Sequence, residues 1–350
     1  MRTACLWLLL QFFLWPAVDL AGQEKLTFKD SLGRRVTIPA EARRVLSLQP
    51  EVTRIIVALG AGDRLVGRDH FVARFDHLFP IIYPAQRDLP VVSAVDGAPN
   101  LEQVIRLDPD LVFASPSEPK IPDSLQNKTG KPVLALSSMG RLEGLLEEIR
   151  LTGAVLGRAE RAAELIGYFR KNFERLQNAV SDIPAGQRPR VYLSFWSSLT
   201  RTPASYDPVT VAGGWNVAQG LMPAYLGTVG IDVDLEKVRM WDPDMILIQG
   251  NYLPAERKVT TAGVLADPRL RSVRAVENGN VFYTFGFWYW WDPALVLVET
   301  LALAKLFHPQ RFPGMDLNRE GNAVFRYFYG VEAGFDRLCR LLDVRDWPWK

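Results

Sequence analysis

Aromatic and arginine side chains follow several of the strands that we predict in this 350-residue chain. Bare aromatic rings in loops suit a flat, bulky or conjugated ligand, and an arginine guanidinium can bind the negative groups of such a ligand. We therefore predict ligand contacts from eight loop residues: Arg68, Phe71, Trp196, Arg201, Tyr252, Trp288, Tyr289 and Trp290. The residues alone leave open the alternative that many of these rings belong to a core or face a membrane.

The sequence carries no motif of a nucleophilic or nucleotide-dependent enzyme. A Gly-x-Ser-x-Gly elbow, a Walker loop and a dinucleotide fingerprint are all absent from it. His70 and His77 do not have the spacing of a helical metal-binding pair. The paired aspartates fall in helix-to-strand turns, which predicts a turn role for them: Asp108, Asp110, Asp242 and Asp244. We expect no catalytic residue, no metal site and no cofactor of the protein's own.

Two segments of the chain repeat each other. Residues 100–114 and 234–248 share Leu-Glu-x-Val, then Asp-Pro-Asp, then four apolar residues. Residues 190–194 likewise repeat the strand-like pattern of residues 44–48. Strand, helix and strand in so few residues indicate a parallel α/β unit, and its repetition predicts two similar lobes. Such lobes bind ligands in a cleft between them, lined by the loops that follow the strands.

One long helix is expected between the two lobes, over residues 158–182. Its apolar residues recur at helical spacing and leave a charged opposite face. Gly157 can close the preceding helix, and Pro184 prevents this one from continuing. The predicted organisation is a leader at 1–21, an N-terminal lobe at 24–157, this helix, a C-terminal lobe at 188–313 and an extension at 314–350.

The first residues of the chain have the composition of a secretory signal. Arg2 precedes an almost wholly apolar run over residues 5–18, which is short for a membrane span. We predict export with Ala21 as the last residue of the leader, and an uncleaved membrane anchor is the alternative. The only cysteines are Cys5 and Cys339, so removal of the leader excludes an intrachain disulfide. A net charge of +2 argues against nucleic acid as a partner.

Further motifs lie in residues 26–60, with Asp-Ser-Leu-Gly-Arg-Arg-Val-Thr-Ile-Pro, and in residues 212–218 and 265–283. Together with the repeated segments, they resemble the class III substrate-binding proteins of ABC importers for iron-siderophore, haem and cobalamin-type chelates. The resemblance covers about residues 25–313. It implies two Rossmann-like lobes on a rigid interdomain helix, little closure on binding, and delivery to a membrane permease. Some related members bind molybdate or tungstate.

The resemblance also implies docking on the permease through one glutamate of each lobe. Arg54 stands where the first of these acids is expected, and Thr210 stands at the second position. Glu51, one turn earlier, is a substitute for the first acid. We therefore take Glu51, Arg54 and Thr210 as the permease-docking positions, without the usual pair of salt bridges.

These observations favour a monomeric periplasmic receptor for a metal chelate, which works with an ABC permease and its ATPase. A receptor for an oxyanion such as molybdate or tungstate is the chemical alternative, and a sensor or adhesion module without transport is a third. An enzyme on the same scaffold would resemble metallocluster oxidoreductases, which need several cysteines that this chain lacks.

Overall fold

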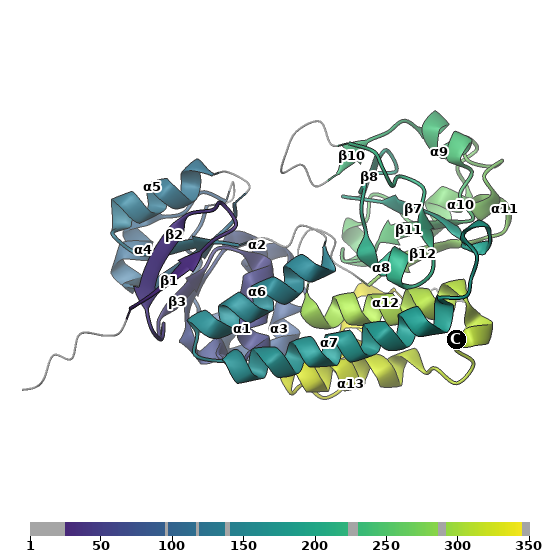
Figure 1. The fold of residues 1–350 in the computed structure, drawn as a ribbon. Coiled ribbons are helices and arrows are strands. Elements are labelled where there is room, and N and C mark those ends of the chain that lie inside the picture. The colour runs from purple at the N-terminus through teal and green to yellow at the C-terminus, as the bar shows by residue number, and fades with distance from the viewer. Residues whose placement is uncertain are drawn as a thin grey trace, which may run out of the picture.

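The computed structural model describes residues 25–94, 97–116, 119–136, 141–222, 230–285 and 292–344. Each of its two lobes is built on a four-stranded sheet whose strands are all parallel, as Figure 1 shows. The α/β class with two lobes is therefore confirmed. The N-terminal sheet has the order β4 (Leu65–Arg68), β3 (Val45–Ser47), β5 (Leu111–Ala114), β6 (Val133–Ala135). The C-terminal sheet has the order β12 (Val281–Thr284), β11 (Met245–Gln249), β7 (Arg190–Ser194), β9 (Trp215–Asn216).

Two small antiparallel pairs accompany these sheets. They are β1 (Lys25–Lys29) with β2 (Arg35–Pro39), and β8 (Arg201–Thr202) with β10 (Ile231–Asp232). The helices of the N-terminal lobe are α1 (Pro50–Ala58), α2 (His70–Phe75), α3 (Phe79–Ile82), α4 (Leu101–Leu107), α5 (Lys120–Thr129) and α6 (Leu142–Val155). Those that follow are α7 (Ala159–Val180), α8 (Asp207–Val211), α9 (Leu235–Trp241), α10 (Thr261–Leu265), α11 (Arg274–Glu277), α12 (Pro293–Phe307), α13 (Leu317–Tyr329) and α14 (Gly334–Leu342).

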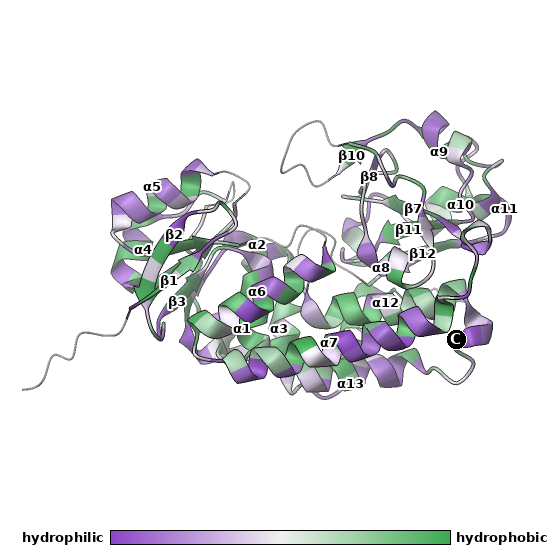
Figure 2. Ribbon diagram, in the orientation of Figure 1, coloured by the Kyte–Doolittle hydropathy of each residue, from purple (hydrophilic) through white to green (hydrophobic). Residues whose placement is uncertain are grey.

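Helix α7 is the predicted interdomain helix. Its 22 residues give a rod of about 33 Å at about 1.5 Å per residue, which is long enough to run beneath both lobes (Figure 1). One stripe of the helix is buried and the opposite side is polar, so the helix is striped in Figure 2. The buried residues are Ala162, Leu165, Phe169, Phe173, Leu176 and Val180.

Helix α12 is enclosed by other helices on all sides. Fourteen of its fifteen residues are buried, and Figure 2 shows it hydrophobic along its length. It packs against α7, α8 and α13. The two helices after it return to the N-terminal lobe, where α13 contacts α1 and α14 contacts α3. The predicted extension thus belongs to the shared core and forms a second connection between the lobes beside α7.

The repeated segments have matching atomic detail. Asn100 and Asp234 cap α4 and α9 by accepting hydrogen bonds from backbone N–H groups three residues on, at 3.1 and 2.6 Å. The helices end at Asp108 and Asp242, which are both left-handed, with φ of 45° and 41°. In the following turn the carboxylate of each lobe's second aspartate accepts the backbone N–H that opens the neighbouring strand, at 2.8 Å in both lobes. The predicted turn role of these carboxylates is confirmed.

Removing either helix cap is expected to cost about 1 kcal/mol of folding free energy, since each cap satisfies an otherwise unpaired N–H group. Asn100→Ala and Asp234→Ala should behave alike because the two caps are equivalent. Urea unfolding followed by circular dichroism measures the loss. Asn100→Ser and Asp234→Asn keep a capping oxygen and serve as controls. Equal stability of the alanine variants and their controls would contradict the capping role.

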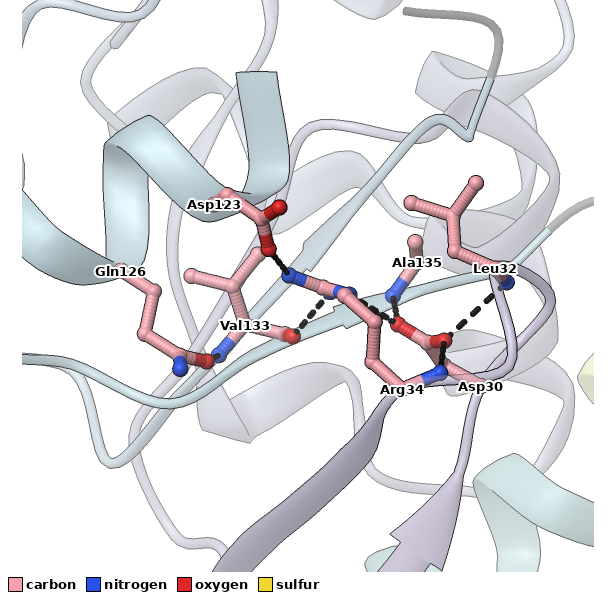
Figure 3. Close-up of polar contacts among 7 residues, drawn as sticks. All are labelled: Asp30, Leu32, Arg34, Asp123, Gln126, Val133 and Ala135. Atoms are coloured by element: carbon pink, nitrogen blue, oxygen red, sulfur yellow. Dashed lines mark hydrogen bonds and ion pairs between the residues drawn. The ribbon is translucent and has the colours of Figure 1, made fainter. Parts of the chain in front are cut away.

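A polar network fastens the β1–β2 hairpin to the N-terminal sheet (Figure 3). Asp30, which is buried, accepts two guanidinium hydrogen bonds from Arg34 at 2.9 and 2.7 Å, and one from the Ala135 N–H at 3.2 Å. Arg34 also donates to the Val133 carbonyl at 2.7 Å and pairs with Asp123 of α5 at 2.6 Å. The hairpin is thereby anchored to β6 within one lobe.

Candidate ligand-binding site

Two of the predicted ligand contacts lie where β4 of the N-terminal lobe ends. Arg68 is the last residue of β4, and its Nε donates to the Leu89 carbonyl at 3.2 Å. Burial lowers the pKa of its guanidinium. Asp69 then caps α2 by accepting the Val72 N–H at 3.0 Å, and this places Phe71 in the first turn of that helix. Short local bonds therefore hold both predicted residues at the strand exit.

An exposed aromatic patch covers α2. The rings of His70, Phe71 and Phe75 lie with their centroids 5.8 to 6.5 Å apart. Phe71 is 36% exposed and Phe75 is 39% exposed, which is high for phenylalanine. The Arg74 guanidinium lies 5.6 Å from the centroid of the Phe75 ring. This combination offers an apolar face next to a cation. Of its residues, only Phe71 was predicted from the sequence as a ligand contact.

In the C-terminal lobe, Trp196 occupies the exit of β7 in a left-handed conformation, with φ of 52°. Its backbone N–H donates to the Gln249 side-chain oxygen at 2.8 Å, and its ring stacks on Phe195 with centroids 5.2 Å apart. The side chain is 47% exposed. Trp196 thus combines a left-handed backbone, which the buried Gln249 amide holds in place, with an exposed indole. Such a combination is typical of a ligand-contact residue.

Arg201 adjoins this tryptophan, and Tyr252 adjoins the next residue, Ser197. The Arg201 guanidinium lies 5.1 Å from the Trp196 ring centroid, within the range of a cation–π contact, and pairs with Asp232 at 3.0 Å. Burial raises the pKa of the Tyr252 hydroxyl, and a hydrogen bond with Ser197 partly offsets this rise. The structure thus brings three predicted residues of this lobe into one cluster: Trp196, Arg201 and Tyr252.

Gln249 contributes to this cluster and was not predicted from the sequence. It ends β11 and is buried, with its side-chain oxygen fixing the Trp196 backbone. A glutamine that closes an otherwise apolar strand is the signal that could have marked it. The three remaining predicted contacts, Trp288, Tyr289 and Trp290, lie outside the described residues.

The predicted docking positions differ in their exposure. Thr210 of α8 is exposed. Glu51 is 2% exposed and Arg54 is unexposed, and the Arg54 guanidinium lies 2.6 Å from the Asp76 carboxylate. The expectation that Glu51 and Arg54 present their side chains to a permease conflicts with this burial. The sequence did not indicate this burial, because other elements, including α6 and α13, also cover the outer side of α1.

Glu51 is a buried acid whose Oε2 has no hydrogen-bond partner among the described residues. Burial raises the pKa of Glu51 to about 8. The positive charge of Arg54 opposes this rise, and the negative charge of Asp69 adds to it. Between the usual pKa of Glu51 and about 8, the folded state therefore binds more protons than the unfolded state. The contribution of Glu51 to stability is complete below its usual pKa and is lost as the pH rises.

We expect the stability of the native protein, relative to Glu51→Gln, to fall by about 1 kcal/mol per unit between pH 5.5 and pH 7.5. The glutamine keeps the shape and cannot ionise, so subtracting its curve isolates this one group. Urea unfolding at four pH values in this interval provides the measurement. Parallel curves for the two proteins would show that Glu51 has an ordinary pKa.

No three histidine, cysteine, aspartate or glutamate side chains within the described ranges gather closely enough to hold a metal ion. No helix in the same ranges is sufficiently long and apolar to cross a membrane. A cavity of about 10 Å³ lies behind the Trp196 loop, between Ser194, Tyr206 and Gln249, and has room for about one water. Another, of about 500 Å³, lies between β1 and α6, away from the predicted contacts.

The chain was compared with known proteins. A periplasmic binding protein family model matches residues 45–285. The molybdate-binding protein MolA of Haemophilus influenzae is 26% identical, over 89% of this chain and 93% of that protein. A cobalamin-binding protein of Halobacterium salinarum is 27% identical, over 83% of this chain and 76% of that protein. The solved structure of MolA bound to molybdate superposes with a TM-score of 0.75 at 24% identity, covering 88% of this chain and 98% of that one.

This chain belongs to the periplasmic binding protein family, whose model spans both sheets. Its two parallel α/β lobes, joined by a long helix, have the fold of class III members. The chain is a solute-binding component of an ABC transporter. The predicted family and fold are confirmed. The relatives are solute-binding proteins that bind different ligands, so the ligand of this chain has to be argued from its own residues.

Proposed function

We propose that this protein captures a metal chelate, such as a ferric siderophore, a haem or a corrinoid, and delivers it to a membrane permease and its ATPase. The observation that carries the proposal is the exposed Trp196 indole, which is stacked on Phe195 and flanked by the Arg201 guanidinium. A chelate of this class has a broad apolar face with polar groups at its edge. An exposed ring beside a cation complements both parts.

The N-terminal lobe supports the same proposal. Phe71 and Phe75 are exposed at the exit of β4, next to the Arg74 guanidinium. Aromatic side chains on both lobes would bind a wide ligand from two sides, as expected where ligands bind at strand exits. We also propose that residues 1–21 direct export, that the receptor acts as a monomer, and that the exposed Thr210 takes part in permease docking.

An oxyanion such as molybdate or tungstate is the second candidate ligand. The similarity to the molybdate-binding MolA, which extends over 93% of that protein, favours it. A small anion is bound by arginines and backbone N–H groups and needs no aromatic surface. Arg68 and Arg201 are the guanidinium groups at the strand exits that could serve it.

Native mass spectrometry of the protein purified from its own cells tests the proposal, since it weighs whatever the protein carries. Tryptophan fluorescence and thermal shift with haem, cobalamin, a ferric hydroxamate and molybdate complete the test. Binding of one of the chelates supports the proposed function, and binding of molybdate alone moves the assignment to the second candidate. A protein that responds to none of these four compounds would contradict both.

A further inference from the structure

A buried polar cluster lies where the two lobes and the C-terminal helices meet. We call the junction cluster the four residues Arg54 of α1, Asp76 at the end of α2, Asp292 at the start of α12, and Tyr329 at the end of α13. Arg54, Asp76 and Asp292 are each less than 5% exposed. Charged side chains are rarely buried so completely without a specific arrangement of partners.

Arg54 and Asp76 form the part of this cluster that belongs to the N-terminal lobe. The Arg54 Nε donates to the Asp76 Oδ2 at 2.7 Å, and the Arg54 Nη2 lies 2.6 Å from the same oxygen. The other oxygen of Asp76 accepts the backbone N–H groups of Leu78 and Phe79, both at 2.9 Å. These bonds fix the turn between α2, which carries the exposed Phe71, and α3.

Asp292 and Tyr329 form the other part of this cluster, at the C-terminal helices. The Asp292 Oδ1 caps α12 by accepting the Leu295 N–H at 2.7 Å, and the Asp292 Oδ2 accepts the Tyr329 hydroxyl. Burial raises the pKa of Asp292 to about 6, and the charge of Arg54 is the strongest opposing influence. Contacts between α1 and α13 bring the helix that carries Arg54 against the helix that carries Tyr329, the hydrogen-bond partner of Asp292. Asp292 also directly follows residues 286–291, which contain the predicted contacts Trp288, Tyr289 and Trp290.

We propose that Arg54 is a positioning residue that sets the placement of one lobe relative to the other, by joining the α2–α3 turn to the start of α12 and the end of α13. The role differs from permease docking, which the sequence assigned to this position. It also does not depend on which ligand the protein binds. A buried guanidinium paired with a buried carboxylate has few alternative arrangements, since any displacement leaves a charge unpaired.

The test measures the distance between the lobes in the full chain without ligand. Spin labels at Lys128→Cys and Arg239→Cys, both exposed and on different lobes, report it by double electron–electron resonance in a Cys5→Ser background, with Cys339 buried. The test variants are Arg54→Lys, which keeps the charge and loses the planar fork, and Tyr329→Phe, which removes one hydroxyl. For both we expect a shifted or broadened distance distribution, together with a lower melting temperature.

Arg34→Lys is the matched control, because Arg34 pairs with a buried aspartate inside one lobe (Figure 3). It should lower the melting temperature and leave the distance distribution unchanged. The proposal is overturned if Arg54→Lys and Tyr329→Phe lower the melting temperature and keep the native distribution, since Arg54 would then only stabilise the fold. Arg54→Met, which leaves the Asp76 carboxylate without its counter-charge, should give the largest change where it folds. The result is independent of the proposed ligand, because no ligand is present.

Discussion

Replacing Trp196 with alanine is expected to weaken the binding of a chelate such as haem or cobalamin by about 30- to 1,000-fold. This corresponds to about 2 to 4 kcal/mol, the usual cost of removing an aromatic residue that dominates a binding surface. Trp196 is the most exposed of the predicted contacts that the structure describes, and Gln249 and Phe195 hold it in place before ligand binds. Isothermal titration calorimetry gives the affinities.

Trp215→Ala is the matched control for this prediction. Trp215 is 43% exposed in β9 of the same sheet, and its pairing with Arg190 places it at the amino end of β7, opposite the strand exits. We expect Trp215→Ala to bind as the native protein does. An equal loss in both variants would indicate a general effect on the lobe. Native affinity of Trp196→Ala for molybdate would instead favour the oxyanion, whose recognition does not need the ring.

Deleting residues 314–350 is expected to leave no stably folded protein. The described part of this segment, residues 314–344, contributes nine buried apolar side chains to the shared core: Leu317, Val324, Phe325, Phe328, Phe335, Leu338, Cys339, Leu342 and Val344. At about 1.5 to 3 kcal/mol for each large side chain, their loss exceeds the net stability of a typical domain, about 5 to 15 kcal/mol. The deletion also exposes α12 to water. Circular dichroism and urea unfolding of the truncated chain test this expectation.

A single substitution in α13 tests the stabilising role of the C-terminal helices in a milder form. Phe328→Ala should cost about 3 to 5 kcal/mol, because the ring contacts Phe169 of α7 edge-on at 5.3 Å between centroids and is buried. Arg326, on the exposed side of α13, pairs with the exposed Glu332, and Arg326→Ala should cost less than about 1 kcal/mol. A truncated chain that unfolds cooperatively at the native urea concentration would show that the C-terminal helices are dispensable.

The parts of the fold that depend on local patterns could be predicted from the sequence. The Asp-Pro-Asp turns repeat because each lobe needs the same left-handed helix end and the same carboxylate bond to the next strand. Helix α7 was predictable because one side of it faces solvent. Helix α12 gave no such pattern, since nearly all its residues are buried and a helix enclosed on every side has no polar face. Its central position therefore appears only in the structure.

The sequence indicated part of the arrangement of the predicted ligand contacts. Strand exits on one lobe meet at one edge of a sheet, which accounts for the positions of Trp196 and Tyr252, and the structure places Arg201 beside Trp196. Ligand contact by these residues stays a prediction. Gln249 and Phe75 were missed because their roles depend on neighbours in space. Arg54 was misread for the same reason: its position in the sequence resembles a surface position, and its partner Asp76 lies 22 residues away in another element. The contribution of Trp288, Tyr289 and Trp290 stays a prediction.

The return of α13 and α14 to the N-terminal lobe has a consequence for the order of events during synthesis. Helices α1 and α3, made early, are covered by α13 and α14, which are made after the whole C-terminal lobe. The first lobe therefore cannot complete its core before α13 and α14 have left the ribosome, although many proteins fold their N-terminal domain first. The N-terminal lobe of a nascent chain therefore stays open until these two helices are released. An open chain is also the form that a translocation channel can thread, so late closure would suit a protein destined for export.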